Sequence, residues 1–257
     1  MPRELREYCK RYMHRRSTLR ARSAFPVKCA AMIALFVLSI SASVRAQSHP
    51  PAVVEITDEP HHVLVLSNER VRVFRLKLAP HEVTLPHRHQ NFYAYVSLLP
   101  ATIGNEVHGR QPVITQLDAG DLHTSKGGFN LAERNESSEL AVVIVIEVLK
   151  SNGAGFSAPM KSFHYHEAAF GELFETSAAR GYVMTVAAGG RIEERTENYD
   201  RLLVAVSDVN LRETSAGQET SGLVMKAGDA RWAVRGSTHA VTNVGTVPAT
   251  FITLELN

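Results

Sequence analysis

The sequence predicts an all-β chain in which two copies of one domain follow an N-terminal export segment. Three observations support this prediction. Short runs rich in β-branched and aromatic residues recur between turn residues, helical periodicity is scarce, and the sequence matches itself without gaps when it is shifted by 108 residues. Many short strands at even spacing are typical of a sandwich or a barrel. With 44% hydrophobic residues, the chain can bury a substantial core.

The first 46 residues have the pattern of a signal peptide. A basic stretch from Arg3 to Lys28 precedes an apolar run of 11 residues from Ala30 to Ile40. That run suits a signal-peptide core and is short for a membrane span. Val44-Arg45-Ala46 places small residues before a cut, so we expect cleavage before Gln47 and a periplasmic or extracellular protein. The alternative is an uncleaved anchor; after cleavage we expect no stable membrane span.

The charge is divided unevenly along the chain. Residues 1–46 hold ten of the 28 Lys and Arg residues but only two of the 26 Asp and Glu residues. The remaining chain therefore has 18 basic and 24 acidic residues and is mildly acidic. Because a nucleic-acid binder needs a basic face, we exclude nucleic acid as a partner. Both cysteines, Cys9 and Cys29, lie in the segment expected to be removed, so the mature chain has neither disulfides nor a thiolate site.

The expected strands are short and fall into two groups. Those of the first copy are Val63–Leu66, Val71–Leu78, Phe92–Leu99, Val113–Leu117 and Ala141–Leu149, and those of the second are Tyr182–Ala187, Leu202–Val206, Gly222–Lys226 and Ala249–Leu256. His164 to Phe174 is the best candidate for a helix. A Gly-containing linker separates the copies, which predicts domains at 47–150 and 160–257 with a linker at 151–159.

The internal repeat organises the chain. Shifted by 108 residues, Asn135 falls on Asn243 and Gly120-Asp121 falls on Gly228-Asp229, while further matches are Ala79 on Ala187, Val96 on Val204, Ala141 on Ala249, Ile144 on Ile252 and Glu147 on Glu255. The matches lie at turns and strand positions. Because the period is longer than that of solenoid repeats, we interpret it as two copies of one domain.

The first copy carries a motif pair. Pro86-His87-Arg88-His89 is followed by Gly120-Asp121 and then by Asn135. This order resembles the two motifs of the cupin superfamily, which are His-x-His with a following Glu, and Gly-Asp with a later His-x-x-x-Asn. The resemblance covers both copies and implies two tandem double-stranded β-helix barrels, which are jelly-roll-like, as in a bicupin. The chain is also similar to exported bacterial cupin-domain proteins of unassigned role.

The resemblance implies a metal site in the first barrel. Residues i and i+2 of a strand face the same side, so His87 and His89 can both point inward. Imidazole nitrogen suits one divalent Fe, Mn, Zn, Ni or Cu ion. However, Tyr93 stands at the position of the motif's Glu, and Leu131 stands at the position of its second-motif His. The alternative is that the two histidines are surface or core residues without a metal.

Other side chains are candidates to complete this first site. Tyr93 could supply a phenolate, and His123 could face the same cavity, with water filling the remaining positions. His61-His62 and His164-Tyr165-His166 lie outside the motif strands. We expect them near the barrel rim, with weak adventitious metal affinity.

The second copy departs from the motifs in the opposite way. His239 stands four residues before Asn243 as the second motif requires, but Arg195 and Glu197 occupy the His-x-His positions and Arg201 the Glu position. If the arginines face inward, they favour an anionic ligand such as a carboxylate or a phosphate. The alternatives are that they face solvent or pair with acidic neighbours, and that His239 is a hydrogen-bonded core residue.

Three functions remain open. The first is an exported protein that binds a small ligand and a divalent metal in the first barrel. The second is a metal-dependent oxygenase-like or isomerase-like enzyme at His87 and His89, and the third is a structural bicupin with decayed sites. The incomplete ligand sets favour the first and third. A homodimer through sheet edges is compatible with all three.

Overall fold

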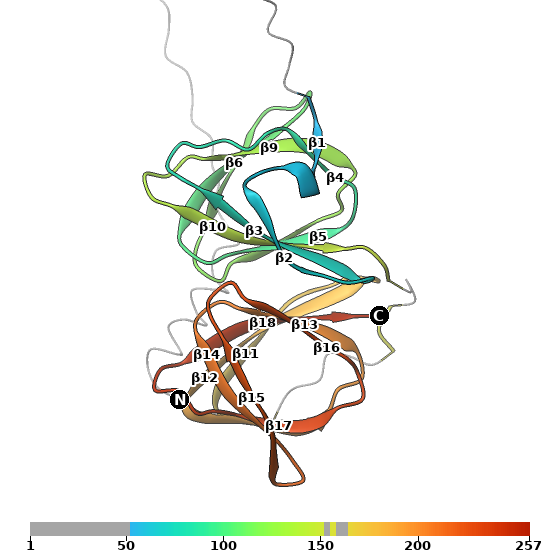
Figure 1. Ribbon diagram of the computed structural model, residues 1–257, viewed down its shortest axis with the longest axis vertical. Helices are drawn as coiled ribbons and strands as arrows, with labels where there is room; N and C mark the ends of the chain where they lie inside the picture. Colours follow the sequence, from blue (N-terminus) through green and yellow to red (C-terminus); the bar gives the residue numbers. More distant parts are fainter. Residues whose placement is uncertain (1–51, 152–154, 158–163) are drawn as a thin grey trace, which may run out of the picture. The chain divides into compact units, whose positions relative to one another are not determined.

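The computed structural model describes residues 52–151, 155–157 and 164–257. The predicted signal segment, 1–46, and most of the predicted linker lie outside these residues. Within the described ranges the chain forms 18 β-strands and one short 3-10 helix (Figure 1). No helix in these ranges is long and apolar enough to cross a membrane. The prediction of an all-β chain is confirmed.

The first barrel comprises strands β1 to β10, coloured blue to yellow-green in Figure 1. Its elements are β1 (Val54–Glu55), η1 (Ile56–Asp58), β2 (His62–Ser67), β3 (Val71–Leu78), β4 (His87–His89), β5 (Tyr93–Ser97), β6 (Ala101–Val107), β7 (Val113–Leu117), β8 (Leu122–Ser125), β9 (Phe129–Asn135) and β10 (Ala141–Val148). They form two five-stranded sheets, ordered β1-β4-β9-β6-β7 and β2-β3-β10-β5-β8. The sheets enclose a core that includes Phe74, Leu78 and Val145.

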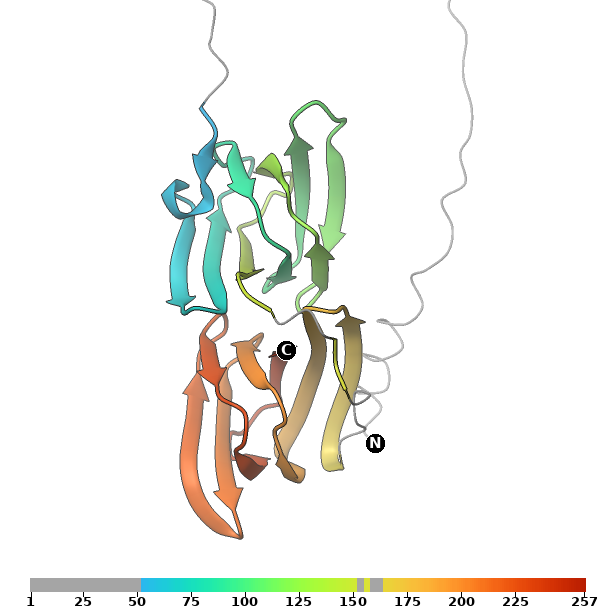
Figure 2. The same cartoon turned by 90° about the vertical axis from the view of Figure 1, so that its right-hand side faces the viewer.

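The second barrel repeats this arrangement. Its strands are β11 (Tyr165–Glu175), β12 (Ala179–Thr196), β13 (Asp200–Ala205), β14 (Val209–Ser215), β15 (Gln218–Met225), β16 (Ala230–Ala233), β17 (Thr238–Asn243) and β18 (Ala249–Leu256). The sheet order is β15-β14-β17-β12-β18-β13-β16, with β11 paired to β12. In Figure 2, the yellow to tan strands β11 and β12 lie side by side.

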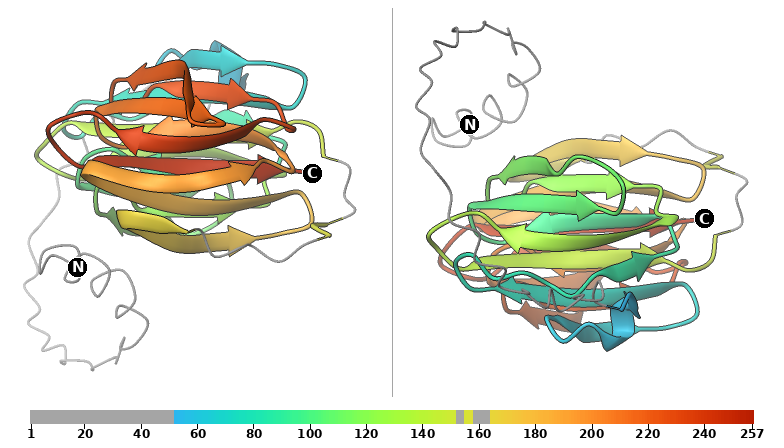
Figure 3. Two further views of the ribbon diagram at one scale, coloured as in Figure 1. Left: turned by 90° about the horizontal axis from the view of Figure 1, so that it is seen from below. Right: turned by 90° about the horizontal axis from the view of Figure 1, so that it is seen from above.

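Strand β12 of the second barrel corresponds to two strands of the first barrel, β3 and β4. Its first part pairs with β18, as β3 pairs with β10, and its last part pairs with β17, as β4 pairs with β9. One continuous strand of 18 residues therefore joins the two faces of the second barrel. Figure 3 shows the curved sheets from both ends.

Buried asparagines make the repeat visible in atomic contacts. The Nδ2 of Asn135 donates to the carbonyl of Leu78 at 3.0 Å, and the Nδ2 of Asn243 donates to that of Val186 at 2.9 Å. Each asparagine also donates to the carbonyl four residues further on. Each pair of partners is 108 positions apart. The amides therefore satisfy the same buried carbonyls in both barrels.

An ion pair and a glycine turn are also repeated. Arg72 lies opposite Glu147 in the first barrel, and Arg180 lies opposite Glu255 in the second, with N–O distances of 2.7 and 2.6 Å. Gly120 and Gly228 both have positive φ angles, of 88° and 85°. Residues with a Cβ rarely adopt this conformation, which explains why glycine recurs at this turn.

One sequence prediction about secondary structure is wrong. His164 to Phe174 was the best helix candidate, but this segment lies almost entirely in β11, which pairs antiparallel with β12. The pairing has register shifts between His166 and Ala168 and between Glu172 and Phe174. These irregularities break the alternation that marks a strand, so the local pattern misleads. Ladder bonds to β12 outweigh a weak helical preference.

A third apolar cluster contains residues of both barrels. In β10, Val143 and Val145 point into the first barrel, while Ile144 and Ile146 point to the opposite face. There they share a cluster with residues of the second barrel such as Ile252. We call this set the inter-barrel cluster; its buried members are Val71, Val73, Ala94, Val96, Ile144, Ile146, Val148, Ala179, Leu202, Val204, Ile252, Leu254 and Leu256. Burial on both faces explains why β10 is apolar almost throughout.

Candidate metal centre

Two histidines of the first barrel lie side by side on β4. The strand pairs in parallel with β1 and antiparallel with β9. The side chains of His87 and His89 are fully buried, whereas Arg88 between them is exposed and pairs with Glu55. The Nε2 atoms of the two histidines are 2.9 Å apart. The two-residue period of the strand therefore brings both imidazoles to one point.

The orientation of His87 is set by the backbone. Its Nδ1 lies 2.9 Å from the carbonyl oxygen of Leu85. A carbonyl only accepts hydrogen bonds, so Nδ1 carries the proton and Nε2 keeps its lone pair. A histidine ligand of a metal is typically held by such a contact at its second nitrogen.

A third histidine comes from β2. Glu59 accepts hydrogen bonds from the Nδ1 atoms of His61 and His62, each at 2.8 Å, and from the backbone of Leu85 at 3.1 Å. Burial alone would raise the pKa of Glu59, but the hydrogen bonds from His62 and His61 lower it to about 2. The ionised carboxylate fixes the ring of His62. Its Nε2 is buried and has no hydrogen-bond partner in the described part of the chain.

Glu133 of β9 completes the group. Its Oε2 lies 3.4 Å from the Nε2 of His87 and 3.8 Å from that of His62, and it has no hydrogen-bond partner among the described residues. One ligand atom from each of His62, His87, His89 and Glu133 lies within 4.8 Å of the others. We call these four residues the His3Glu cluster. Three imidazole nitrogens and one carboxylate oxygen suit a divalent transition metal.

Burial keeps two of these imidazoles uncharged. It lowers the pKa of His87, and burial together with His87 and His62 lowers the pKa of His89 to about 2. A neutral imidazole is the form that binds a metal. The donor atoms and their protonation states therefore fit a bound cation.

Of the other two candidate ligands, Tyr93 contacts this cluster and His123 contacts Tyr95. The ring of Tyr93 packs against that of His89 in a tilted arrangement with a centroid distance of 4.2 Å, and burial raises the pKa of the phenol. His123 on β8 is not a member of the cluster, and its ring stacks on Tyr95 at 5.3 Å. Their roles as metal ligands stay predictions.

Sequence reasoning missed two members of the cluster. We expected His61-His62 near the barrel rim, which is wrong for His62, because this residue is only 4% exposed. Its position depends on the turn through Glu59, which no motif marks. Glu133 could have been found, because it stands two residues after Leu131, the position of the motif's second His, and so faces the same side of β9.

The second barrel holds a different group at the equivalent positions. Arg195 lies opposite His239 in the register, as His87 lies opposite Leu131. The Oε1 of Glu197 is 2.8 Å from Arg195, and 3.7 Å from His239.

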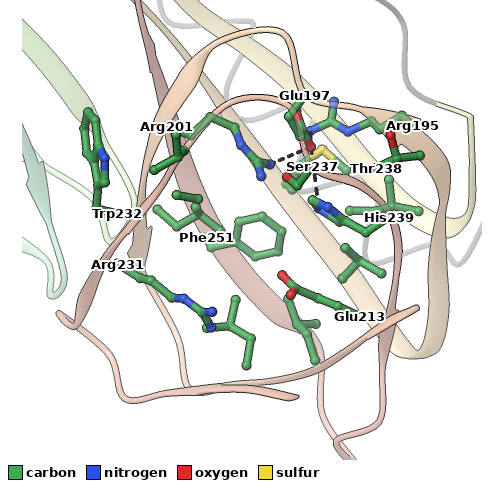
Figure 4. Close-up of a pocket in the computed structure, with 18 of the residues that line it drawn as sticks. Arg195, Glu197, Arg201, Glu213, Arg231, Trp232, Ser237, Thr238, His239 and Phe251 are labelled. Atoms are coloured by element: carbon green, nitrogen blue, oxygen red, sulfur yellow. Dashed lines mark hydrogen bonds and ion pairs between the residues drawn. The ribbon is translucent and has the colours of Figure 1, made fainter. Parts of the chain in front are cut away.

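Arg201 joins this group from β13. Its Nη1 donates to Glu197 at 2.5 Å, and it is only 5% exposed. The arginines therefore pair with Glu197 inside the barrel rather than with their acidic sequence neighbours. Figure 4 shows the group at the wall of a cavity of about 460 Å³.

A much smaller cavity lies beside Glu133 in the first barrel. This cavity is about 20 Å³ and is lined by Tyr93, Tyr95 and Glu133 among others. That volume is roughly enough for one water molecule.

Comparison with known proteins identifies the fold. No model of a known protein family matches the chain, and no curated protein matches its sequence. Solved structures do match. AerE from Microcystis aeruginosa has 12% identity and a TM-score of 0.53, over 77% of this chain and 98% of its own. Oxalate decarboxylase from Bacillus subtilis, a protein with Mn(II) centres, has 13% identity and a TM-score of 0.54, over 74% and 70%.

A third match is salicylate 1,2-dioxygenase from Pseudoaminobacter salicylatoxidans, with 12% identity and a TM-score of 0.50, over 73% of this chain and 68% of that one. The fold is the cupin fold. The prediction of two tandem double-stranded β-helix barrels is confirmed. At these identities the likeness concerns the fold alone, so the chemistry of each cupin barrel has to be argued from its own residues.

Proposed function

We propose that the chain is a metal-binding bicupin that holds one divalent transition metal in its first barrel. The His3Glu cluster carries this proposal, because four buried ligand atoms converge there from three strands. Two of them, the Nε2 of His62 and the Oε2 of Glu133, lack hydrogen bonds in the described part of the chain. Buried polar atoms are seldom left without partners, and a bound cation satisfies them.

The small cavity favours binding over turnover. The cavity of about 20 Å³ beside Glu133 has room for roughly one water molecule. A closed site with four protein ligands is typical of structural metals, whereas catalytic sites keep an open position. The Mn(II) centres of the similar oxalate decarboxylase support metal binding by this fold. An oxygenase-like activity would require the first barrel to open.

The test is metal content. The chain, purified without an affinity tag, is incubated with Mn²⁺, Zn²⁺ or anaerobic Fe²⁺, desalted and measured by elemental mass spectrometry. We expect about one metal per chain, lost in His87→Ala/His89→Ala and in Glu133→Gln. His123→Ala is the matched control and should keep its metal, since His123 stacks on Tyr95 outside the cluster. Substoichiometric metal in every protein after incubation would refute the proposal.

We further propose that the protein is exported. The basic stretch, the apolar run and the small residues before Gln47 support this proposal. Expression of the full chain in a Gram-negative host, followed by fractionation, tests it. We expect a periplasmic product whose intact mass matches a chain that starts at Gln47. A full-length cytosolic product would contradict the proposed export.

A further inference from the structure

The second barrel holds a partly open cavity that is large enough for a small organic molecule. Its volume is about 460 Å³, within the range of small-molecule sites. Much of its wall is apolar, and Met184, Leu203, Leu223 and Phe251 belong to the buried core of this barrel. A ligand held here would bury an apolar body.

Three arginines also line this cavity. Arg195 and Arg201 share the carboxylate of Glu197, so a single negative charge is divided between two guanidinium groups. The Nε of Arg201 is buried without a hydrogen-bond partner in the part of the chain that the structure describes. The Arg195–Glu197–Arg201 network therefore carries a net positive charge, and it lies in the low-dielectric wall of the cavity.

The third guanidinium belongs to Arg231 on β16. Arg231 lies opposite Leu203 in the pairing of β16 with β13, so both side chains face the cavity. In the view of Figure 4, Phe251 lies between the side chains of Arg201 and Arg231. The structure shows no ion pair or hydrogen bond of the Arg231 side chain with another described residue. Its five N–H donors are available to a ligand.

The charges at the cavity do not cancel. Arg195, Arg201 and Arg231 face two carboxylates, Glu197 and Glu213. The hydroxyl of Ser221 donates to Glu213, which leaves its charge in place. Burial, followed by the charge of Arg201, lowers the pKa of His239, so this imidazole is neutral near pH 7. One positive charge at the cavity of the second barrel is therefore uncompensated. The His3Glu cluster lies in the first barrel and plays no part in this balance.

We propose that the second barrel binds a small monocarboxylate with an apolar body. The carboxylate pairs with Arg231, within the positive field of Arg201 and Arg195, and the apolar body packs against Phe251 and its neighbours. A guanidinium can grip a carboxylate through two parallel hydrogen bonds. This inference does not rest on the metal site, because the two cavities lie in different barrels.

Titration calorimetry on the full chain, treated with a chelator, tests the proposal. The probes are hexanoate and 3-phenylpropanoate, with their neutral amides and inorganic phosphate as comparisons. We expect both carboxylates to bind, and the amides and phosphate to bind at least about tenfold more weakly. Arg231→Gln should weaken carboxylate binding by about tenfold or more, while Arg231→Lys should restore part of it because it keeps the charge.

The control is Arg110→Gln, which alters an exposed arginine of the first barrel and should leave binding unchanged. Because Arg231 is itself exposed, its substitution leaves the buried core intact. The proposal is overturned if neither carboxylate binds, if the amides or phosphate bind as well as the carboxylates, or if Arg231→Gln behaves like Arg110→Gln. If the chain takes up no metal but still binds carboxylates, the metal proposal is refuted and the carboxylate proposal stands.

Discussion

Glu59 and His62 share a hydrogen bond of 2.8 Å that turns the Nε2 of His62 toward the interior of the first barrel. Both side chains are buried, and Glu59 also binds the backbone of Leu85, next to the strand of His87. A carboxylate that orients a ligating histidine in this way adjusts both its geometry and its basicity. Glu59 is thus a positioning residue for the His3Glu cluster.

We expect Glu59→Gln to lower metal affinity about 10- to 100-fold while the chain remains folded. The amide oxygen can still accept from His62, but the negative charge is lost. Competition with a chromophoric chelator measures the affinity. Glu55→Gln, which alters an exposed carboxylate paired with Arg88, is the matched control. Equal affinities in the two variants would argue against this role.

Tyr93→Phe should change metal affinity by less than about threefold. The His3Glu cluster already supplies four ligand atoms, and phenylalanine preserves the ring contact with His89. The same chelator competition measures the effect. A loss of tenfold or more would instead show that the phenolic oxygen is a ligand.

Asn135→Ala and Asn243→Ala should each lower the free energy of unfolding, by about 2 kcal/mol, because each leaves buried carbonyls without donors. The repeat predicts similar losses in the two barrels. Urea denaturation measures them, with Asn210→Ala as the control, since that side chain is exposed. A change within about 0.5 kcal/mol for either buried asparagine would contradict the prediction.

His239 predicts a pH dependence of stability. Its pKa in the folded chain lies below the ordinary value of 6.5, so the unfolded chain binds this proton more readily. The contribution of neutral His239 is complete above about pH 6.5 and is lost as the pH falls through the folded-state pKa. Between about pH 7.5 and 5, His239→Gln should lose less unfolding free energy than the unaltered chain. Identical pH profiles would exclude this contribution.

The inter-barrel cluster predicts cooperative unfolding. Leu254→Ala should cost about 2–5 kcal/mol, because Leu254 is fully buried in this cluster. Trp232, the only tryptophan of the chain, packs against the same cluster, so its fluorescence reports on it. We expect unfolding curves from fluorescence and far-UV circular dichroism to coincide. Two separated transitions would mean that the barrels unfold independently.

The two-residue period and the repeat made much of the fold predictable. They predicted β3, β7 and β18 with their observed bounds, the common direction of His87 and His89, and the repeated pair Gly120 and Gly228. Of the strands that were not predicted, β1, β8 and β16 have at most four residues, but β6, β9 and β14 have seven each.

The site was less predictable than the fold. His62 depends on a turn and on a strand pairing with a register shift, neither of which leaves a pattern in the sequence. The cavity of the second barrel depends on which side chains fail to fill the interior. Arg231 could be assigned to this cavity only once its pairing opposite Leu203 was known. Such long-range relations do not follow from local sequence.

The face of β10 that carries Ile144 and Ile146 has a consequence for how this chain can evolve. A first barrel ending at Val148 would present those side chains to water, where an apolar patch promotes aggregation. The second barrel is therefore needed as a cover, whatever its cavity binds. Selection can thus retain Ile252 and Leu254 for solubility while the interior of the second barrel changes. In this way a duplicated domain can lose one chemistry and acquire another while its covering surface is still needed.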